Sequence, residues 1–280
     1  MSPKFKTIEQ SEDDSIQSAS KLAPRLLYEV IRRDGEEELK RPNQSLIWSG
    51  IAAGMMISFS VLGEAILQSH LPKASWSYLV ENLGYSLGFL LVIMGRMQLF
   101  TENTITTVLP IMVKWNSAMF GRLIRLWIIV LTANVCGAFA IALFYAHTNT
   151  LSSEIHEAIT SLSKHAIHIP AGESFTRAIP AGVLIAAIVW MLPQAESSAF
   201  FVILTFTWLI AVGDFTHIIA GSFEMAFLMV NGELGITAAL FGFFLPVLMG
   251  NIVGGTAIFS LLAWGQVKEE IKQNTRKDDH

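Results

Sequence analysis

Two groups of polar residues lie inside hydrophobic stretches of the sequence, where their side chains could do chemistry. The first extends from Arg96 to Thr104, and the second contains Asp214, Thr216 and His217. Polar and charged groups are costly to bury in an apolar environment, and inside a membrane they commonly mark a solute pathway. The two groups therefore predict a polar site within a hydrophobic protein.

His217 is the residue best suited to act at such a site. It is the only histidine inside a hydrophobic segment, and imidazole changes charge near neutral pH. It could donate a hydrogen bond or a proton to a small carboxylate or similar anion, with Asp214 as a nearby carboxylate to support its charge. A neutral acid crosses a hydrophobic constriction more cheaply than its anion. The alternative is a structural histidine bonded to a carbonyl group.

Both polar groups interrupt hydrophobic stretches that are too long to cross a bilayer once. These stretches run from about residue 76 to 112 and from about 198 to 230. A continuous helix of either length would measure ~50 Å, whereas the hydrocarbon core is ~30 Å thick. We expect breaks at about 97–104 and 213–221, because broken helices that face each other at mid-membrane commonly build a solute site.

The composition is typical of a polytopic membrane protein and not of a soluble enzyme. Of the 280 residues, 52% are apolar and 15% are charged, and the mean hydropathy is +0.49. Cys136 is the single cysteine, which excludes a disulfide within the chain. No metal and no cofactor is expected. Hydrophobic segments are expected at about 45–68, 76–112, 123–147, 174–193, 198–230 and 236–264.

The basic residues predict the orientation. Lys and Arg concentrate before the first segment, between the second and third, and after the sixth, so the positive-inside rule places both termini in the cytoplasm. Residues 1–44 should form a cytoplasmic N-terminal segment with an amphipathic helix on the membrane face, and residues 265–280 a cytoplasmic tail. The apolar positions of that helix are Leu22, Leu26, Leu27, Val30 and Ile31.

The two halves of the chain resemble each other. In residues 45–147 and again in 174–264, a Phe-Thr pair is followed at nearly the same distance by an Asn-x-x-Gly sequence. Three segments per half give the halves opposite orientations, which is an inverted repeat. The glycines would let helices approach closely, and the asparagines could bind backbone groups freed at the breaks. Ordinary packing of small residues is the alternative. The paired residues are Phe100-Thr101 with Asn134 and Gly137, and Phe215-Thr216 with Asn251 and Gly254.

The segment between the halves, residues 148–173, is expected to be a solvated periplasmic loop. It contains His156, His165 and His168, and His147 borders it. Their irregular spacing and the lack of an acidic or cysteine partner argue against a metal site.

These motifs give the chain a resemblance to the formate/nitrite transporter family over about residues 41–267. Leu99-Phe100-Thr101 matches the end of the family's second-helix motif, and Phe215 and His217 match its fifth-helix motif. The sequence Gly250-Asn251-Ile252-Val253-Gly254-Gly255 matches its sixth-helix motif. Arg96, Met97 and Gln98 depart from the small and acidic residues expected before Leu99. Thr216 replaces an acidic residue, and Gly221 replaces an asparagine. The chain therefore resembles a divergent branch of the family.

The resemblance implies an all-α membrane protein with six transmembrane helices in an aquaporin-like inverted repeat, in which the second and fifth helices are broken. It implies a homopentamer in the bacterial inner membrane, with one pore per protomer that passes small monovalent anions or their neutral acids. The expected partners are the lipid bilayer, the solute and other copies of the chain, without nucleic acid. No enzymatic activity is expected.

The resemblance favours a place for His217 in the pore, and the inverted repeat, which brings the two breaks together, predicts that it lies within one side chain of Thr101. The candidate hydrophobic rings beside this centre are Leu99, Phe100 and Phe215, and the candidate vestibule residues are Tyr85 and Phe89. Thr216 and Asp214 flank His217 and complete the candidate set. Interhelical or lipid-facing packing is the alternative for each apolar residue.

Arg96 is expected to form an ion pair, because a lone guanidinium is costly in a membrane. Opposite chain directions of the second and fifth segments would place Arg96 and Glu224 on the same outer half, so Glu224 is the predicted partner, with Glu102 and Glu64 as lesser candidates. The pair would brace the two broken helices. An alternative role for Arg96 is to draw anions into the vestibule.

Two further classes of protein stay open. An intramembrane hydrolase would use Ser222 with His217, although five residues on one segment give a poor geometry for a nucleophile and its base. A non-conducting structural or sensing protein would have the same fold with its pore closed around Arg96. Labelling of Ser222 by a serine-reactive probe and solute flux in liposomes would separate these classes from a channel.

Overall fold

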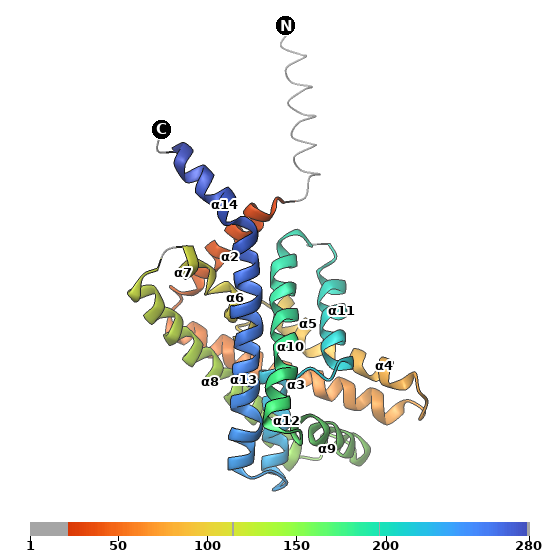
Figure 1. Cartoon of the computed structure of the whole chain (residues 1–280). Coiled ribbons are helices and arrows are strands. Elements are labelled where there is room, and N and C mark those ends of the chain that lie inside the picture. The colour runs from red at the N-terminus through yellow and green to blue at the C-terminus, as the bar shows by residue number, and fades with distance from the viewer. Residues whose placement is uncertain (1–21, 114, 196, 279–280) are drawn as a thin grey trace, which may run out of the picture.

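The computed structural model describes residues 22–278 except 114 and 196, with side chains up to residue 270. In that part of the chain all regular secondary structure is helical, as the sequence predicts (Figure 1). Residues 1–21 of the expected N-terminal segment lie outside the described residues. Helices α2 and α7 lie toward the end of the molecule at which α14 is labelled, and α9 and α12 lie toward the opposite end.

Among the described residues, five helical stretches are long and apolar enough to cross a membrane. Three of them join several elements end to end, and the last contains the two wider π-type stretches η3 (Ala238–Phe244) and η4 (Val253–Ser260). The stretches are α3 (Asn43–His70), α4–η1–α5 (Ser77–Glu81, Asn82–Tyr85, Ser86–Met94), α8 (Ser117–His147), α10–η2 (Ala171–Met191, Leu192–Gln194) and η3–α13–η4–α14, in which α13 spans Leu245–Ile252 and α14 spans Leu261–Asp278.

The two longest hydrophobic stretches each divide into separate helices. The first stops being helical after Met94 and continues as α6 (Phe100–Thr106) and α7 (Leu109–Val113). The second divides into α11 (Ala199–Val212) and α12 (Ile218–Val230). The interruptions, 95–99 and 213–217, overlap the expected breaks but are shorter, because α6 and α12 resume at Phe100 and Ile218.

Glycine sets the closest helix contacts in both halves. A Cβ added to Gly137 of α8 would lie 2.3 Å from the Ile51 carbonyl oxygen of α3. A Cβ added to Gly254 would lie 2.2 Å from the Ile179 carbonyl oxygen of α10. Side chains larger than hydrogen do not fit at either distance, so both helix pairs depend on the glycine of the Asn-x-x-Gly sequence.

The segment between the halves contains a helix that the sequence analysis missed. Residues Ser153–Ile167 form α9, and the Ser152 hydroxyl accepts from the Ile155 N–H at its start. Ala158 and Ile159 are buried in a cluster with Phe223 of α12. The expected solvated loop is thus wrong: apolar residues recur at helical spacing in α9, and this face packs on the bundle through Ile155, Ala158, Ile159 and Leu162.

The amphipathic helix near the N-terminus is α2 (Pro24–Glu38), which begins with proline in its first turn. Of the expected apolar stripe, Leu27 and Ile31 are buried, whereas Leu22, Leu26 and Val30 are exposed. Tyr28 is fully buried, its hydroxyl donates to the Leu109 carbonyl oxygen of α7 at 3.2 Å, and its ring lies 5.6 Å from that of Trp264. These contacts dock α2 against both α7 and α14.

Candidate functional site

The two interruptions have the same backbone geometry. Arg96 and Asp214 adopt left-handed φ angles of 51° and 52°. Leu99 and His217 are extended and precede the first residues of α6 and α12. Left-handed backbone is uncommon for residues other than glycine, so its recurrence at both breaks supports a structural repeat. In the structure, Leu99 occupies the position in the first break that His217 occupies in the second. The two Phe-Thr sequences do not occupy corresponding positions, although their sequences are alike.

Two asparagines hold the interruptions in the same way. Asn134 accepts from the Phe100 N–H at 2.9 Å and donates to the carbonyl oxygens of Gln98 and Gly50, both at 2.8 Å. Asn251 accepts from the Ile218 N–H at 2.8 Å and donates to the carbonyl oxygens of Thr216 at 3.0 Å and Ala178 at 2.8 Å. In each set the N–H and the first-named carbonyl group are freed at the break, as the sequence predicted. Gly50 and Ala178 lie inside α3 and α10, so the bonds to their carbonyl groups tie each break to a neighbouring helix.

His217 and Thr101 meet where the two interruptions face each other. The Nε2 atom of His217 lies 2.8 Å from the Thr101 hydroxyl oxygen, and both side chains are buried. The Nδ1 atom of His217 accepts the Ala220 N–H at 3.3 Å. Because Nδ1 accepts, the proton of the neutral ring lies on Nε2, which donates to Thr101. Phe89 packs against the ring edge to face, with centroids 4.9 Å apart.

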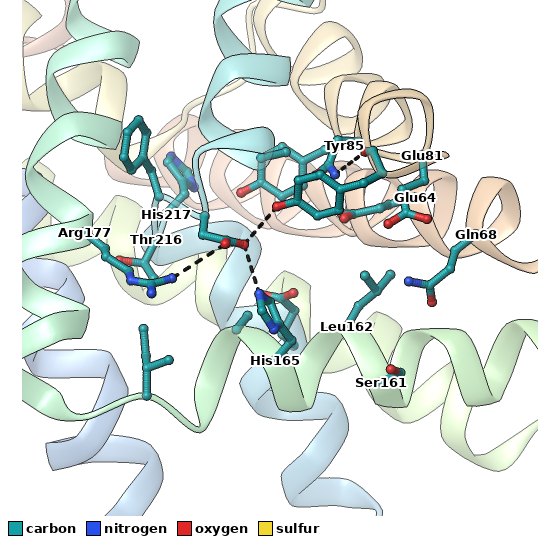
Figure 2. A pocket seen from close by; sticks show the side chains of 18 of the residues that line it. Glu64, Gln68, Glu81, Tyr85, Ser161, Leu162, His165, Arg177, Thr216 and His217 are labelled. Carbon is teal, nitrogen blue, oxygen red and sulfur yellow. Dashed lines mark hydrogen bonds and ion pairs between the residues drawn. The ribbon is translucent and has the colours of Figure 1, made fainter. Parts of the chain in front are cut away.

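Thr216 and Asp214 contact other groups than His217. The Thr216 hydroxyl donates to the Ser174 carbonyl oxygen at 2.9 Å. The Asp214 carboxylate accepts from the Tyr78 hydroxyl at 3.1 Å and lies 2.9 Å from Nε2 of His165 and 3.9 Å from Arg177 (Figure 2). The expected support of His217 by Asp214 is therefore wrong, because the left-handed turn at Asp214 directs its side chain to α4, α9 and α10.

Two cavities lie beside this centre, and they are lined by different helices. One, of about 280 Å³, contains His217, Thr216, Phe215 and Tyr85 in its lining and is bordered by α9. The other, of about 570 Å³, contains Leu99 and is bordered by α2. We call them the α9-side and α2-side cavities. His217 lines the first, and α6, the helix that carries Thr101, lines the second with Glu102, Asn103 and Thr106.

Phe100 does not lie beside either cavity. It is buried against Trp127 of α8, with ring centroids 5.6 Å apart and edge-to-face geometry. It therefore packs α6 on α8 instead of forming a ring in the path. Leu99, Phe215 and Tyr85 line the cavities, and Phe89 lies between Tyr85 and His217.

The predicted pair of Arg96 and Glu224 is wrong. Arg96 lines the α2-side cavity together with Asp34 and Glu37, whereas Glu224 lines the α9-side cavity together with Glu64. Arg96 lies after the end of α5, where the chain has already reached α2. The left-handed turn then directs its side chain away from α12, toward acidic residues that the sequence alone did not place there.

Gln98 and Glu38 are site residues that sequence reasoning missed. The Gln98 amide donates to the Glu38 carboxylate of α2 at 2.9 Å and accepts from the Asn103 amide at 3.1 Å. Burial raises the pKa of Glu38, whereas Arg41 and Gln98 lower it. The only sequence signal was an amide in an apolar stretch. Its partner is 60 residues away, and only the docking of α2 brings the two together.

The hydrolase arrangement is not formed. The Ser222 hydroxyl donates to the Ile218 carbonyl oxygen at 2.7 Å within α12, and His217 contacts Thr101 instead. A nucleophile and its base need a mutual hydrogen bond. The site therefore lacks the geometry of nucleophilic catalysis.

The fold and the site together define a multi-pass helical membrane protein with a polar centre between two opposed helix interruptions. Residues 25–265 match the formate/nitrite transporter family model. The chain belongs to this formate/nitrite transporter family.

Relatives and solved structures agree with this assignment. The chain is 43% identical to "Inner membrane protein YfdC" of Escherichia coli (strain K12) over 90% of its own length and 81% of the relative. It is 28% identical to "Formate channel FocA" of Haemophilus influenzae over 77% of this chain and 84% of that one. The solved structure "Pentameric formate channel with formate bound" aligns with a TM-score of 0.67 at 20% identity, covering 79% of this chain and 96% of that one. "FNT family ion channel" aligns with a TM-score of 0.76 at 18% identity, covering 86% and 98%.

Proposed function

We propose that the chain is a channel or transporter that passes small monovalent anions or their neutral acids, with His217 as its central polar group. The observation that carries this function is the buried 2.8 Å contact of His217 with Thr101 between two cavities. A donor held at a hydrophobic constriction can bind a carboxylate or nitrite oxygen where water is excluded. The family membership and the formate-channel relatives support the solute class.

The proposed architecture has six spans in an inverted repeat, with the second and fifth broken. The repeats comprise residues 45–147 and 174–264, and 148–173 lie on the periplasmic side. The matching backbone angles at Arg96 and Asp214 and the matching bonds of Asn134 and Asn251 support it. Both termini would be cytoplasmic, by the positive-inside distribution of Lys and Arg. The relative named as an inner membrane protein and the pentameric neighbour support a homopentamer in a bacterial inner membrane.

A solute screen with purified protein in liposomes tests this function. Formate, nitrite, hydrosulfide, acetate and lactate would be offered in turn, and uptake followed against protein-free liposomes. We expect at least one of these solutes to equilibrate faster in the protein-containing liposomes. A complete lack of flux would favour the second candidate, a non-conducting protein of the same fold closed around Arg96, which lines the α2-side cavity among acidic residues.

A further inference from the structure

The α9-side cavity has an acidic lining, which is unexpected on a path for anions. It contains four carboxyl groups and one guanidinium, that of Arg177. Like charges repel, and a cavity walled by apolar side chains strengthens the field of its charged groups. Some of these carboxyl groups must therefore be neutralised when an anion enters. The four are Glu64, Glu81, Asp214 and Glu224.

Two of the four lack any partner that could neutralise them. Glu64 of α3 and Glu224 of α12 are each only 9% exposed, and both line the cavity. Within the described residues neither makes a hydrogen bond or a salt bridge, although the two interact electrostatically. Glu81, in contrast, is bonded to Gln68. Buried carboxyl groups without a partner are costly as ions, and of two that repel each other in one site at least one is more stable when protonated.

The cationic side chains around the cavity, together with Tyr78, contact Asp214 and not Glu64 or Glu224. Tyr78 of α4, His165 of α9 and Arg177 of α10 all contact Asp214 (Figure 2). Tyr85 lines the same cavity, and its ring lies 5.3 Å from that of Phe89, which packs on His217. Glu64 and Glu224 therefore line the same cavity as His217, and the cavity's cations contact Asp214 instead of them.

We propose that at least one of Glu64 and Glu224 carries a proton at rest and donates it to a weak-acid anion that enters from the α9 side. The O–H bond of the carboxyl pair breaks as an O–H bond forms on a carboxylate or nitrite oxygen of the solute. The pair is left with one more negative charge, and a proton from the outer solution restores it. The solute advances to His217 and Thr101 as a neutral acid, which crosses the apolar constriction more cheaply than an anion. This inference rests on the proposed function.

Flux at two pH values separates proton donation by the protein from passage of acid already neutral in solution. Formate and nitrite uptake would be measured in liposomes at pH 5 and pH 7 for the wild type and for E64Q/E224Q. At pH 5 the solution supplies more neutral acid, so we expect the variant to stay within about twofold of the wild type. At pH 7 we expect its flux to fall at least about tenfold, a bound set below the ~10²–10⁴-fold that a general acid typically contributes.

Glu157→Gln is the matched control. Glu157 is an exposed carboxylate of α9 on the same side of the molecule and does not line the cavity. The flux of the Glu157→Gln variant should equal that of the wild type at both pH values. The wild type gives an independent result that needs no substitution. Its flux should fall less steeply than the neutral acid in solution, which falls about tenfold per pH unit above its pKa.

Each remaining outcome is decisive. If the wild type conducts and E64Q/E224Q loses flux by the same factor at both pH values, or loses none, the pair is not the proton donor although the proposed function stands. A wild-type flux that falls tenfold per pH unit shows that the solution supplies the proton, even if the double variant does not assemble. If the wild type conducts no solute at pH 5, the proposed function fails and this inference fails with it.

Discussion

At the scale of single residues, the interruptions depend on Asn134 and Asn251. Each asparagine binds one N–H and one carbonyl group that the helix break leaves unpaired, and a second carbonyl group inside a neighbouring helix. Water cannot satisfy such groups in the apolar interior of a membrane. The interruptions between α5 and α6 and between α11 and α12 therefore require these two side chains.

Replacing Asn251 with leucine should destabilise the protein strongly. The Ile218 N–H and the Thr216 carbonyl oxygen would lose their partner, at about 1–3 kcal/mol for each unsatisfied group. Thermal unfolding in detergent measures the loss. Asn231→Ala is the control, because its side chain is only partly buried and bonds to a single carbonyl of its own helix. Equal melting temperatures for the two variants would contradict the proposed tie.

Thr101 should be replaceable by serine but not by valine. Valine removes the hydroxyl that accepts from His217 at 2.8 Å and leaves a buried N–H unpaired, at about 1–3 kcal/mol. Serine keeps the acceptor. Flux in liposomes should therefore fall at least about tenfold for Thr101→Val and stay near the wild-type value for Thr101→Ser. Similar flux for the two variants would show that the hydroxyl has no part in passage.

At the scale of helices, sequence reasoning succeeded where a local pattern decides the structure. The all-helical class and the family follow from long hydrophobic segments and from motifs such as Gly250–Gly255. It failed where distant parts of the chain meet. Arg96 was assigned to Glu224 by chain direction alone, but the turn after α5 carries it to α2. Helix α9 was missed because its burial depends on α12.

Gly254→Ala should loosen the contact between η4 and α10. The added methyl group would lie 2.2 Å from the Ile179 carbonyl oxygen, so the helices must separate, at about 1–3 kcal/mol. Gly265→Ala is the matched control, because nothing lies within 4 Å of a Cβ there. We expect a lower unfolding temperature in detergent for Gly254→Ala alone. Equal stability of the two variants would contradict the close approach.

The docking of α2 should weaken as the pH rises. Burial raises the pKa of Glu38 above its ordinary value of 4.5, so the docked state binds this proton more tightly than the undocked state. The protonated Glu38 carboxyl group therefore stabilises docking fully below pH 4.5, and this stabilisation is lost as the pH rises through the raised pKa. A spin label at position 33, which is exposed, should gain mobility over this range in the wild type and not in Glu38→Gln. A pH-independent wild-type signal would contradict the coupling.

At the scale of the whole molecule, two halves enclose one centre that neither contains alone. His217 belongs to the second half and Thr101 to the first, and they lie 116 residues apart in sequence. The sequence predicted their proximity because an inverted repeat brings both breaks to one place. It could not predict the acidic linings of the two cavities, because α2, α3, α4 and α12 contribute them from separate parts of the chain.

The most direct test of the central claim is the flux of His217→Phe beside that of His168→Phe in liposomes. Phenylalanine fills the position but cannot donate to a solute or to Thr101, whereas His168 is exposed at the end of α9. We expect His217→Phe to lose at least about tenfold in formate or nitrite uptake at every pH from 5 to 8, with His168→Phe equal to the wild type. Wild-type flux and an unchanged pH profile for a folded His217→Phe would contradict the placement of His217 at the centre of a conducting pore.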